Sequence, residues 1–541
     1  MKNTTGCSAK AKPGVPAEVP SGRIGGGRPQ SELTIDASLD PHDALVEPDD
    51  ATRARPSIAG PWRWTGFFAS GAIAASAPLW RLAGDEWRLT LPFVPHDGRK
   101  PYTTTLFLIS TAVLALSWIM HLRRVERSLA PERARNRAVM LTLALWFVPV
   151  FLGPPLLSSD IYSYAAQGEM VTRGLDPTSQ GMYELGSGSY VLRTDPLWRT
   201  PVVGNGYGPV QMGAAAAAVY VSGHNVNGTI WALRVLAVLG VAVAGWGLVQ
   251  IAREVGLDPP TALMIGVANP IVVLHVIGGG HNDGLLMGLL FAGIALARRH
   301  WWWGVALIAM AASVKAPAIA ALPYLAWCRP GRRAVWQERA RSVAQAGAAA
   351  LGVILAWSLV VGVGFGWINS MRNAGSSKDT LSITTQLGFI VSDGINSVGL
   401  TTNSNFWIGA FRLVGMGAIA ALGVWLLLNA QRLTPLRAAG LASLAMVVLG
   451  PVVWPWYLAA AIGLLAVTDL GRWRASLMVV TAAFACEVFP SSYGGKGPDG
   501  NHLFATLVLV GIGAVAVVLP WIPTWWAAAQ DRAASRVVLA D

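Results

Sequence analysis

Charged residues are scarce in this chain: they make up only 13% of its 541 residues, whereas about 25% is usual for a soluble domain. So little charge cannot cover the water-exposed surface of a chain this long. Hydrophobic residues reach 53%, and long apolar runs recur between about residues 64 and 526. We therefore expect an all-α polytopic membrane protein, and the same composition excludes a disordered chain and a coiled coil.

Cysteine is almost absent. Cys7, Cys328 and Cys486 lie far apart and form no CxxC pair, so neither a zinc cluster nor a disulfide framework is indicated. The N-terminus lacks an apolar run, so we expect no cleavable signal peptide. Walker A, HExxH and GxSxG patterns are also missing, as is a GxGxxG before a helix, and ATP use and hydride transfer are therefore not supported.

The apolar segments define three parts of the chain. Residues 1–60 predict a disordered cytoplasmic tail, 61–526 a membrane domain, and 527–541 a cytoplasmic C-terminal tail. A span needs about 20 residues, and the apolar segments predict about 13–14 transmembrane helices, several of them short. These segments are approximately 64–83, 102–122, 138–157, 229–251, 261–277, 284–297, 301–313, 318–327, 342–365, 405–428, 438–453, 455–468, 475–489 and 503–526.

The net charge of +12 follows from membrane topology and does not indicate a nucleic-acid partner. Lys and Arg stay on the cytoplasmic side during insertion, so the arginine-rich loops 123–137 and 329–341 should be cytoplasmic. Residues 158–228 then form a large outer loop with juxtamembrane helices. This assignment holds if the apolar stretch 209–222 does not cross, and we expect it to be re-entrant or to lie flat in the outer leaflet.

Polar residues collect on the predicted outer side, beginning with Asp160. In a helix, Tyr164 and Gln167 follow Asp160 on one face, and Glu169 lies nearly opposite. An ionisable residue at the membrane edge is costly and indicates function, so Asp160 is a candidate general base. The alternative is that Asp160 only caps the helix, for which Ser158 and Ser159 are also suited.

Further along the same outer loop, Arg193 can pair with Asp195, and Trp198 and Tyr207 are interfacial aromatic residues. These residues either contact an acceptor or form a membrane belt. The Pro and Gly content of the loop favours an ordered structure over a linker.

A glycine-rich turn with adjacent polar residues interrupts the apolar stretch 269–284. The backbone N–H groups of Gly279 and Gly280 could approach an anion, and His281 could donate to phosphate or move a proton. Asn282 and Asp283 complete the turn. An ordinary polar hairpin turn is the alternative, and a metal site is disfavoured because no second cluster has ligand spacing.

Other positive charges near the membrane are candidates for binding an anion. Lys315 lies between two short apolar stretches, where it either snorkels or meets a phosphate or carboxylate. Arg372 and Lys496 could join the same site, whereas we expect Lys378 to be an ordinary loop charge. Two arginines near the outer ends of their segments, Arg234 and Arg412, are expected to snorkel.

Several of these stretches, taken in order, resemble a known family. They are SSDIYSYAAQGEM (158–170), GLDP (174–177), YGPV (207–210), NPIVVLHVIGGGHNDG (269–284) and ASVKAPA (312–318). They look like the polyprenyl-phosphomannose-dependent α-1,6-mannosyltransferases of actinobacteria, which build the mannan core of lipomannan and lipoarabinomannan. The resemblance implies the GT-C membrane glycosyltransferase fold and an inverting reaction. Two places depart from the family pattern: WRTPVVGNGYGP is longer, and DPT stands for DPY.

The resemblance also implies roles for individual residues. Asp160 matches the acidic catalytic residue of the first outer loop, which favours the base over the cap. The donor would be polyprenyl-phosphate mannose, with its phosphate bound by His281, Lys315, the 278–280 backbone and Arg372. The acceptor would be the 6-hydroxyl of an α-1,6-mannan or a phosphatidylinositol-mannoside-type glycolipid. We expect no metal or other cofactor, and a multi-pass protein of the plasma membrane with its active site facing outward.

Two other functions compete with this interpretation. A secondary transporter or flippase of lipid-linked sugars would also use broken helices and buried charges, although no inverted repeat is visible. The same fold could instead take another polyprenyl-phosphate sugar, such as arabinose or glucose. Within the mannosyltransferase class, we favour initiation and proximal elongation of the mannan.

Overall fold

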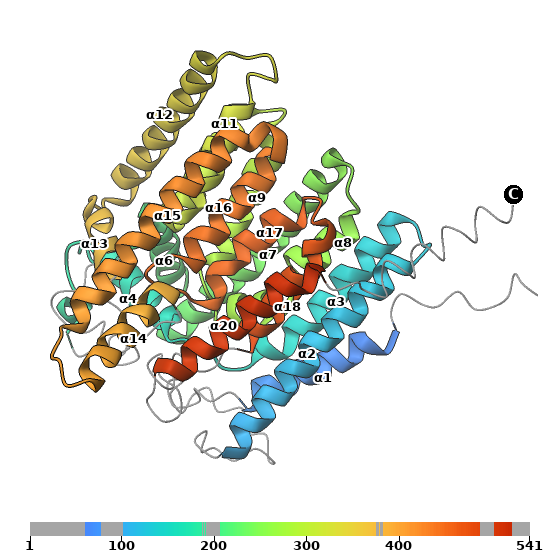
Figure 1. The fold of residues 1–541 in the computed structure, drawn as a ribbon, viewed down its shortest axis with the longest axis horizontal. Helices are drawn as coiled ribbons and strands as arrows, with labels where there is room; N and C mark the ends of the chain where they lie inside the picture. The colour runs from blue at the N-terminus through green and yellow to red at the C-terminus, as the bar shows by residue number, and fades with distance from the viewer. Residues whose placement is uncertain are drawn as a thin grey trace, which may run out of the picture. The chain divides into compact units, whose positions relative to one another are not determined.

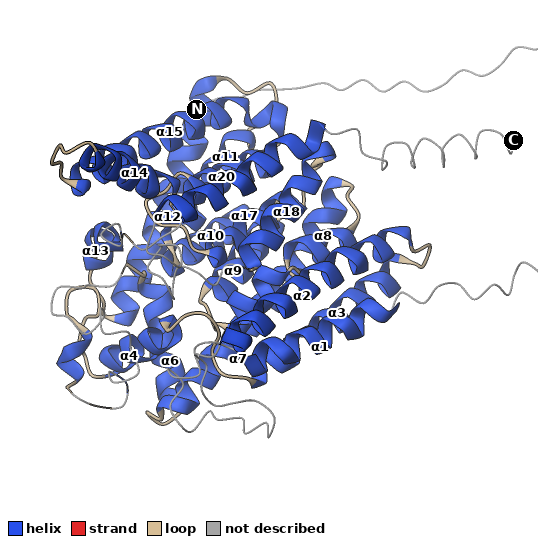
Figure 2. Ribbon diagram, turned by 60° about the horizontal axis from the view of Figure 1, so that its bottom comes forward, coloured by secondary structure: helices blue, strands red, loops and turns tan. Residues whose placement is uncertain are grey.

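A computed structural model of the chain describes residues 60–76, 101–186, 188, 190, 206–374, 378, 382–486 and 502–521. Every regular element among them is a helix (Figures 1 and 2). In order they are α1 (Gly60–Ser76), α2 (Pro101–Arg127), α3 (Glu132–Leu152), α4 (Asp160–Thr172), η2 (Met182–Leu185), α6 (Pro209–Val221), α7 (Val226–Val255), α8 (Pro259–Gly266), η4 (Val272–Gly278), α9 (Asp283–Ala297), α10 (Trp301–Val314), η5 (Ala316–Ala320), α11 (Ala321–Cys328), α12 (Trp336–Val361), α13 (Gly366–Ala374), α14 (Ile383–Ser397), α15 (Ser404–Leu433), α16 (Pro435–Val448), η6 (Pro455–Tyr457), α17 (Leu458–Ala466), η7 (Gly471–Trp473), α18 (Arg474–Ala485), α20 (His502–Val518) and η8 (Leu519–Trp521).

The predicted all-α membrane architecture is confirmed. Five helices in the described part of the chain, α2, α3, α7, α12 and α15, are long and apolar enough to cross a membrane. The pair η4 and α9 passes the same test together, with a bend of 111° at the break between them. Further apolar helices of 10–17 residues surround these spans. The protein is therefore multi-pass, and the total of 13–14 crossings stays a prediction.

The segment expected at 261–277 is not one helix. It divides into α8 and the π-helix η4, and Asn269 and Pro270 stand at the break. Proline cannot donate a backbone hydrogen bond, and the side chain of Asn269 replaces the missing contacts. Its amide donates to the carbonyls of Ile265 and Gly266, and its oxygen accepts from the N–H of Val272. An asparagine that satisfies the backbone in this way lets a helix break while fully buried.

The basic loop 123–137 lies beside other charged helix ends. Arg135 pairs with Asp258 at 2.7 Å, and Arg253 pairs with Glu132 at 2.7 Å, which joins the loop 123–137 to the end of α7 and the start of α8. Arg474 at the start of α18 pairs with Glu126 near the end of α2. These pairs gather charged residues at one end of α2, α3 and α7, and which side of the membrane that end faces stays a prediction.

Two helices, α13 and α14, lie between the apolar segments expected at 342–365 and 405–428, in a stretch for which no apolar segment was predicted. Asp176, just after α4, holds the start of α13: its carboxylate accepts the N–H of Gly364 at 3.1 Å. Ser370 of α13 donates to the carbonyl of Thr178 at 3.2 Å. In both ribbon views α13 therefore lies beside α4 and α6. The DPT sequence thus contributes a docking point for α13.

The helix α6 covers the stretch 209–222 and packs against α4, α7, α10 and α12. At about 1.5 Å per residue, its 13 residues extend only about 20 Å, less than the hydrocarbon thickness. This length favours the predicted re-entrant or flat placement, which stays a prediction.

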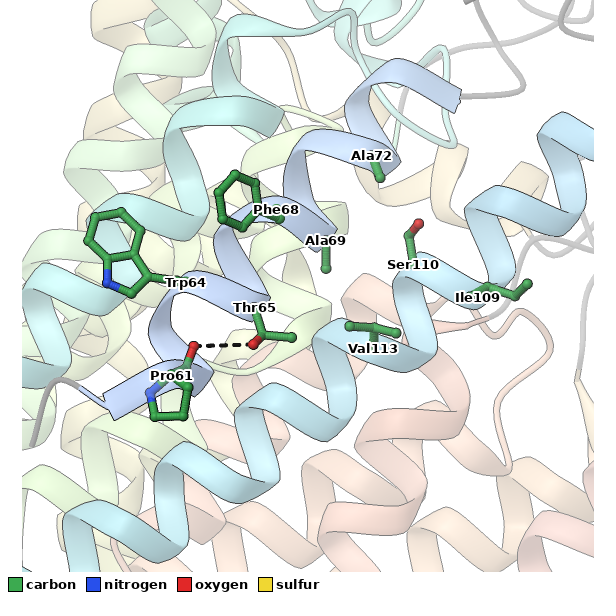
Figure 3. Close-up of a pocket in the computed structure, with 9 residues that line it drawn as sticks. All are labelled: Pro61, Trp64, Thr65, Phe68, Ala69, Ala72, Ile109, Ser110 and Val113. Atoms are coloured by element: carbon green, nitrogen blue, oxygen red, sulfur yellow. Dashed lines mark hydrogen bonds between the residues drawn. The ribbon is translucent and has the colours of Figure 1, made fainter.

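An apolar groove of about 560 Å³ runs between α1 and α2 (Figure 3). Trp64 and Phe68 of α1 line one side, and Ile109 of α2 lines the other, all largely exposed. Inside the groove, Thr65 donates its hydroxyl to the carbonyl of Pro61 at 3.1 Å, so little polar capacity is left for a ligand. The groove suits contact with lipid chains and holds none of the predicted site residues.

The closest helix crossing joins α7 to α9 through small residues. A Cβ added to Gly240 of α7 would lie 2.2 Å from the carbonyl oxygen of Gly284, and one added to Gly288 would lie 2.7 Å from that of Gly240. Small residues let membrane helices approach until their backbones touch. This contact fixes the start of α9 against α7.

We predict that Gly240→Ala lowers the thermal unfolding midpoint of the protein in detergent, because the new methyl group must separate α7 from α9. Overpacking of this kind costs about 1–3 kcal/mol. Gly347→Ala on α12 is the matched control, since a Cβ there meets nothing within 4 Å, and alanine should be neutral or stabilising by about 0.5–1 kcal/mol. Equal midpoints for the two variants would show that the α7–α9 contact is not close.

Candidate active site

Asp160 is the first residue of α4, with Ser159 at the cap position, and no side chain caps the helix. The Asp160 side chain is 22% exposed and points its Oδ2 toward the 278–283 turn. His281 Nδ1 lies 3.6 Å from this oxygen, and the hydroxyl of Tyr164 donates to it at 3.4 Å. The geometry therefore supports the role of an available carboxylate rather than that of a helix cap.

Tyr164 connects the two sides of this cluster. Its hydroxyl lies 3.4 Å from Asp160 Oδ2, 3.4 Å from the hydroxyl of Tyr207, 3.5 Å from His281 Nδ1 and 3.4 Å from Asn282 Oδ1. The single hydroxyl hydrogen reaches one acceptor at a time, so the contacts with Asp160 Oδ2 and Asn282 Oδ1 are alternatives, whereas Tyr207 and His281 can instead donate to the hydroxyl oxygen. Contacts of this length often tighten when a substrate binds. The predicted helical spacing of Tyr164 and Asp160 is thus confirmed as a contact.

The 278–283 turn reaches Asp160 because glycine allows close packing. Gly280 has φ +69°, and a Cβ there would meet the Cδ1 of Ile161 at 2.4 Å. The N–H of Gly279 is already bonded to the carbonyls of Leu274 and His275, so this amide does not support the predicted phosphate contact. In this structure the glycines bring His281 against the start of α4.

Lys315 follows α10 directly, where the chain turns extended before η5. Its Nζ donates to Asp283 Oδ2 at 2.8 Å, and both side chains are nearly buried. The ammonium also lies 4.2 Å from the centre of the Tyr457 ring and 5.9 Å from that of Tyr207. The snorkelling alternative is therefore wrong for Lys315, which meets a carboxylate.

The electrostatics of the cluster affect Asp160 most directly. Burial raises the pKa of its carboxyl above the ordinary range, and the positive charge of Lys315 acts against that shift. Asp283 adds to the rise through its own negative charge. A carboxylate with a raised pKa is a stronger base and is better suited to accept a proton from a hydroxyl group.

Arg234 is the second predicted snorkelling residue that the structure corrects. It is fully buried, and its guanidinium donates to the carbonyls of Gly153 at 2.6 Å and Val150 at 2.5 Å. A longer contact of 3.4 Å reaches the carbonyl of Gly278. A buried arginine with these partners ties the end of α3 to the glycine turn. Arg412, half-buried, donates to Thr385 and to the carbonyl of Pro451.

The remaining predicted residues divide into three groups. Gln167 is buried, and neither polar atom of its amide has a hydrogen-bond partner among the described residues; within the same residues, Nδ2 of Asn282 also has none. Glu169 instead pairs with Arg173 at 2.8 Å and with His224 at 2.7 Å, away from Asp160. Arg372 lies on α13, and its side chain is outside the described part, as are the residues Arg193, Asp195, Trp198 and Lys496.

The sequence analysis missed the aromatic residues of WPWY (454–457). Trp456 stacks on His281 with ring centres 3.9 Å apart, Trp454 stacks on Trp456, and Tyr457 faces Lys315. The sequence pattern that could have indicated them is three aromatic residues around a proline, at the boundary between two apolar segments. Among the described residues, no three His, Cys, Asp or Glu side chains come together in a way that could hold a metal ion.

These features define a class: a polytopic α-helical membrane protein with a carboxylate, a histidine and a lysine gathered at one end of its helices. Comparison with known proteins names it more closely. A family model described as "Alpha-(1->6)-mannopyranosyltransferase, N-terminal domain" matches residues 63–331, and one described as "MptB C-terminal domain" matches residues 384–522. The chain belongs to the α-(1→6)-mannopyranosyltransferase family.

Curated relatives agree over most of the chain. It is 28% identical to α-(1→6)-mannopyranosyltransferase A of Corynebacterium glutamicum, over 85% of this chain and 94% of the relative. The chain is also 28% identical to α-(1→6)-mannopyranosyltransferase B of the same organism, over 74% of this chain and 72% of the relative. Identity to α-(1→6)-mannopyranosyltransferase A of Mycobacterium tuberculosis is 30%, over 74% and 76%. No solved structure matches. The protein is an all-α membrane mannosyltransferase, which decides against the transporter and flippase.

Proposed function

We propose that this enzyme moves mannose from polyprenyl-phosphate mannose to the 6-hydroxyl of an α-1,6-mannan acceptor, with inversion and with Asp160 as general base. The observation that carries the proposal is the partly exposed Asp160 carboxylate 3.6 Å from His281, in one cluster with Lys315. The relatives' printed names supply the sugar and the α-(1→6) linkage.

The transfer step uses Asp160 to accept a proton. As the acceptor O6 attacks C1 of the mannosyl group, its hydrogen passes to the carboxylate, and the C1–O bond to the phosphate breaks. The bonding electron pair leaves with the polyprenyl phosphate, and attack from the opposite face converts a β-linked donor into an α-linked product. General-base assistance of this kind contributes about 10²–10⁴-fold.

The departing phosphate needs positive charge and hydrogen-bond donors. Lys315 retains further N–H donors beyond the one given to Asp283, and His281 lies on the same side of the cluster as Asp160. The hydroxyls of Tyr207 and Tyr457, which surround the ammonium, are additional donors. We also propose that the backbone of Gly280 and the residue Arg372 contact the donor phosphate.

The acceptor is proposed to contact two side-chain amides that have buried polar atoms without a partner among the described residues. A buried amide without a partner costs free energy, and a sugar hydroxyl both donates and accepts. Gln167, on the face of α4 that carries Asp160 and Tyr164, and Asn282 therefore suit the hydroxyls of a mannan or of a phosphatidylinositol-mannoside-type glycolipid.

The orientation follows from the charged ends of the helices. Asp160 begins α4 just after α3 ends, at the opposite end of α3 from the basic loop 123–137. If that loop is cytoplasmic, the site faces the outer side of the plasma membrane, where the polyprenyl chain of the donor can stay in the bilayer.

We predict that Asp160→Asn abolishes mannosyl transfer while the protein stays folded, because an amide cannot accept the hydroxyl proton. Release of polyprenyl phosphate from labelled donor, with a short mannoside acceptor in detergent, measures this. Asp393→Asn, an exposed carboxylate of α14, is the matched control and should keep wild-type rate. More than about a tenth of the rate in Asp160→Asn would exclude this base.

We predict that kcat/KM falls as the pH drops through the raised pKa of Asp160, above the ordinary value of about 3.9. The base form exists only above that pKa, so activity is lost on the acid side. Lys315→Met should move this limb to higher pH, because the lysine charge lowers the pKa and the unpaired Asp283 raises it further. A limb that stays in place, or moves down, would contradict the assignment.

We further propose that no metal cofactor takes part, since Lys315 supplies positive charge to both carboxylates of the cluster. Treatment with EDTA should therefore leave the transfer rate within about twofold of that of the untreated enzyme. A tenfold loss would correspond to about 1.4 kcal/mol of lost transition-state stabilisation. Complete inhibition that added Mn²⁺ reverses would overturn this part of the proposal.

A further inference from the structure

The WPWY segment forms a tight turn with a fixed direction. Trp454 is extended, as residues before proline tend to be, and Pro455 opens the short helix η6. The N–H of Tyr457 donates to the carbonyl of Trp454 at 3.0 Å and closes the turn. Trp456 and Tyr457 are therefore neighbours on one rigid turn, and each contacts a different residue of the candidate active site.

Trp456 contacts His281 face to face. The two rings are 3.9 Å apart between centres and only 19° from parallel, and both side chains are nearly or fully buried. Stacking of this kind favours one plane for the imidazole ring. Within that plane, the contacts of Nδ1 with Asp160 and with the hydroxyl of Tyr164 distinguish the observed orientation from the flipped one.

Trp454 supports this stack from the other side. Its ring is parallel to that of Trp456 within 3°, with centres 5.3 Å apart. Trp456 is thereby packed between Trp454 and His281, which restricts its own rotation.

The chain entering the turn is anchored by polar contacts from two other helices. At the start of α14, Ser382 donates to the carbonyl of Gly450 at 2.7 Å, and Thr385 donates to that of Pro451 at 3.1 Å. Arg412 of α15 also donates to the Pro451 carbonyl, at 3.2 Å. The position of Trp456 is thus determined by the C-terminal part of the chain.

We propose that Trp456 is a positioning residue, whose stacking holds the His281 ring in the orientation that the reaction requires. This inference rests on the proposed function, which assigns His281 to the donor phosphate beside Asp160. It adds Trp456, from the second family-matched region (384–522), to a site whose Asp160, His281 and Lys315 come from the first (63–331).

The kinetic test compares Trp456→Leu with Trp456→Phe. Displacing a group by about 1 Å can cost about 10²-fold, so we expect Trp456→Leu to lower kcat/KM by about that factor. Phenylalanine keeps an aromatic face, and Trp456→Phe should stay within about fivefold of wild type by the same reasoning. Trp425→Leu, at an indole of α15 that is 53% exposed, is the control and should leave kcat/KM unchanged. Equal losses in the Leu and Phe variants would overturn the proposal.

A double-mutant cycle separates positioning from general packing. If Trp456 acts through His281, then Trp456→Leu should add little to the loss already caused by His281→Gln. Losses that multiply, with His281→Gln clearly impaired, would overturn the positioning role and leave the proposed function intact. Wild-type rate in His281→Gln would instead overturn the role of His281 in the proposed function, and the positioning role with it.

A spectroscopic readout tests the stack without activity. In protein labelled with [13Cε1]-histidine, His281→Gln identifies the Hε1 resonance of His281, which the indole ring current should shift upfield. Trp456→Leu should move that resonance downfield, and Trp425→Leu should not. An unchanged His281 resonance in folded Trp456→Leu would show that the two rings are not stacked and would overturn the proposal.

Discussion

The ion pair between Lys315 and Asp283 is the constraint on which the arrangement of the site depends. Each residue begins or ends a helix in an apolar protein, and neither charge would be stable there alone. Their 2.8 Å contact therefore fixes the start of α9 against the end of α10. Because Asp283 follows His281 by two residues, the same pair also fixes the turn that carries the histidine.

Two other contacts fix the position of the 278–283 turn relative to α3 and α7. The backbone contact between Gly240 and Gly284 places α9 directly on α7, and Arg234 of α7 ties the turn to the end of α3. The chain leaves α3 and starts α4 with Asp160 a few residues later. The carboxylate and the histidine thus approach because three separate helix ends are held at one place.

The sequence predicted the parts of this site that depend on local spacing. Asp160 and Tyr164 are one helical turn apart, so their contact could be derived from periodicity, and the cost of burial singled out His281, Asp283 and Lys315. The helices themselves were equally accessible, because long apolar runs determine them. The break at Asn269 and Pro270 was missed, since its stability depends on side-chain bonds to the backbone that an apolar run does not reveal.

Contacts between distant segments were harder to predict. Lys315 and Asp283 were both candidates, but 32 residues separate them and only the fold pairs them. Arg234 was misassigned because an arginine near a helix end can reach either the membrane surface or buried carbonyls, and the sequence is the same for both. WPWY was missed because aromatic residues in an apolar context are typical of ordinary membrane packing.

The aromatic residues around the candidate site would favour transfer to an acceptor over hydrolysis, because they would limit the access of water. A glycosyl donor that meets water instead of a sugar hydroxyl is lost, so a transferase benefits from a site that excludes water. Aromatic surface from Trp456 and three tyrosines, Tyr164, Tyr207 and Tyr457, lies around the lysine and the histidine, and the tyrosine hydroxyls still offer hydrogen bonds. Low polarity would also strengthen the interaction between Lys315 and the leaving phosphate of the proposed donor. In the proposed reaction, the same aromatic residues would orient the charged groups, strengthen their interaction with the leaving phosphate, and exclude water in favour of the acceptor hydroxyl.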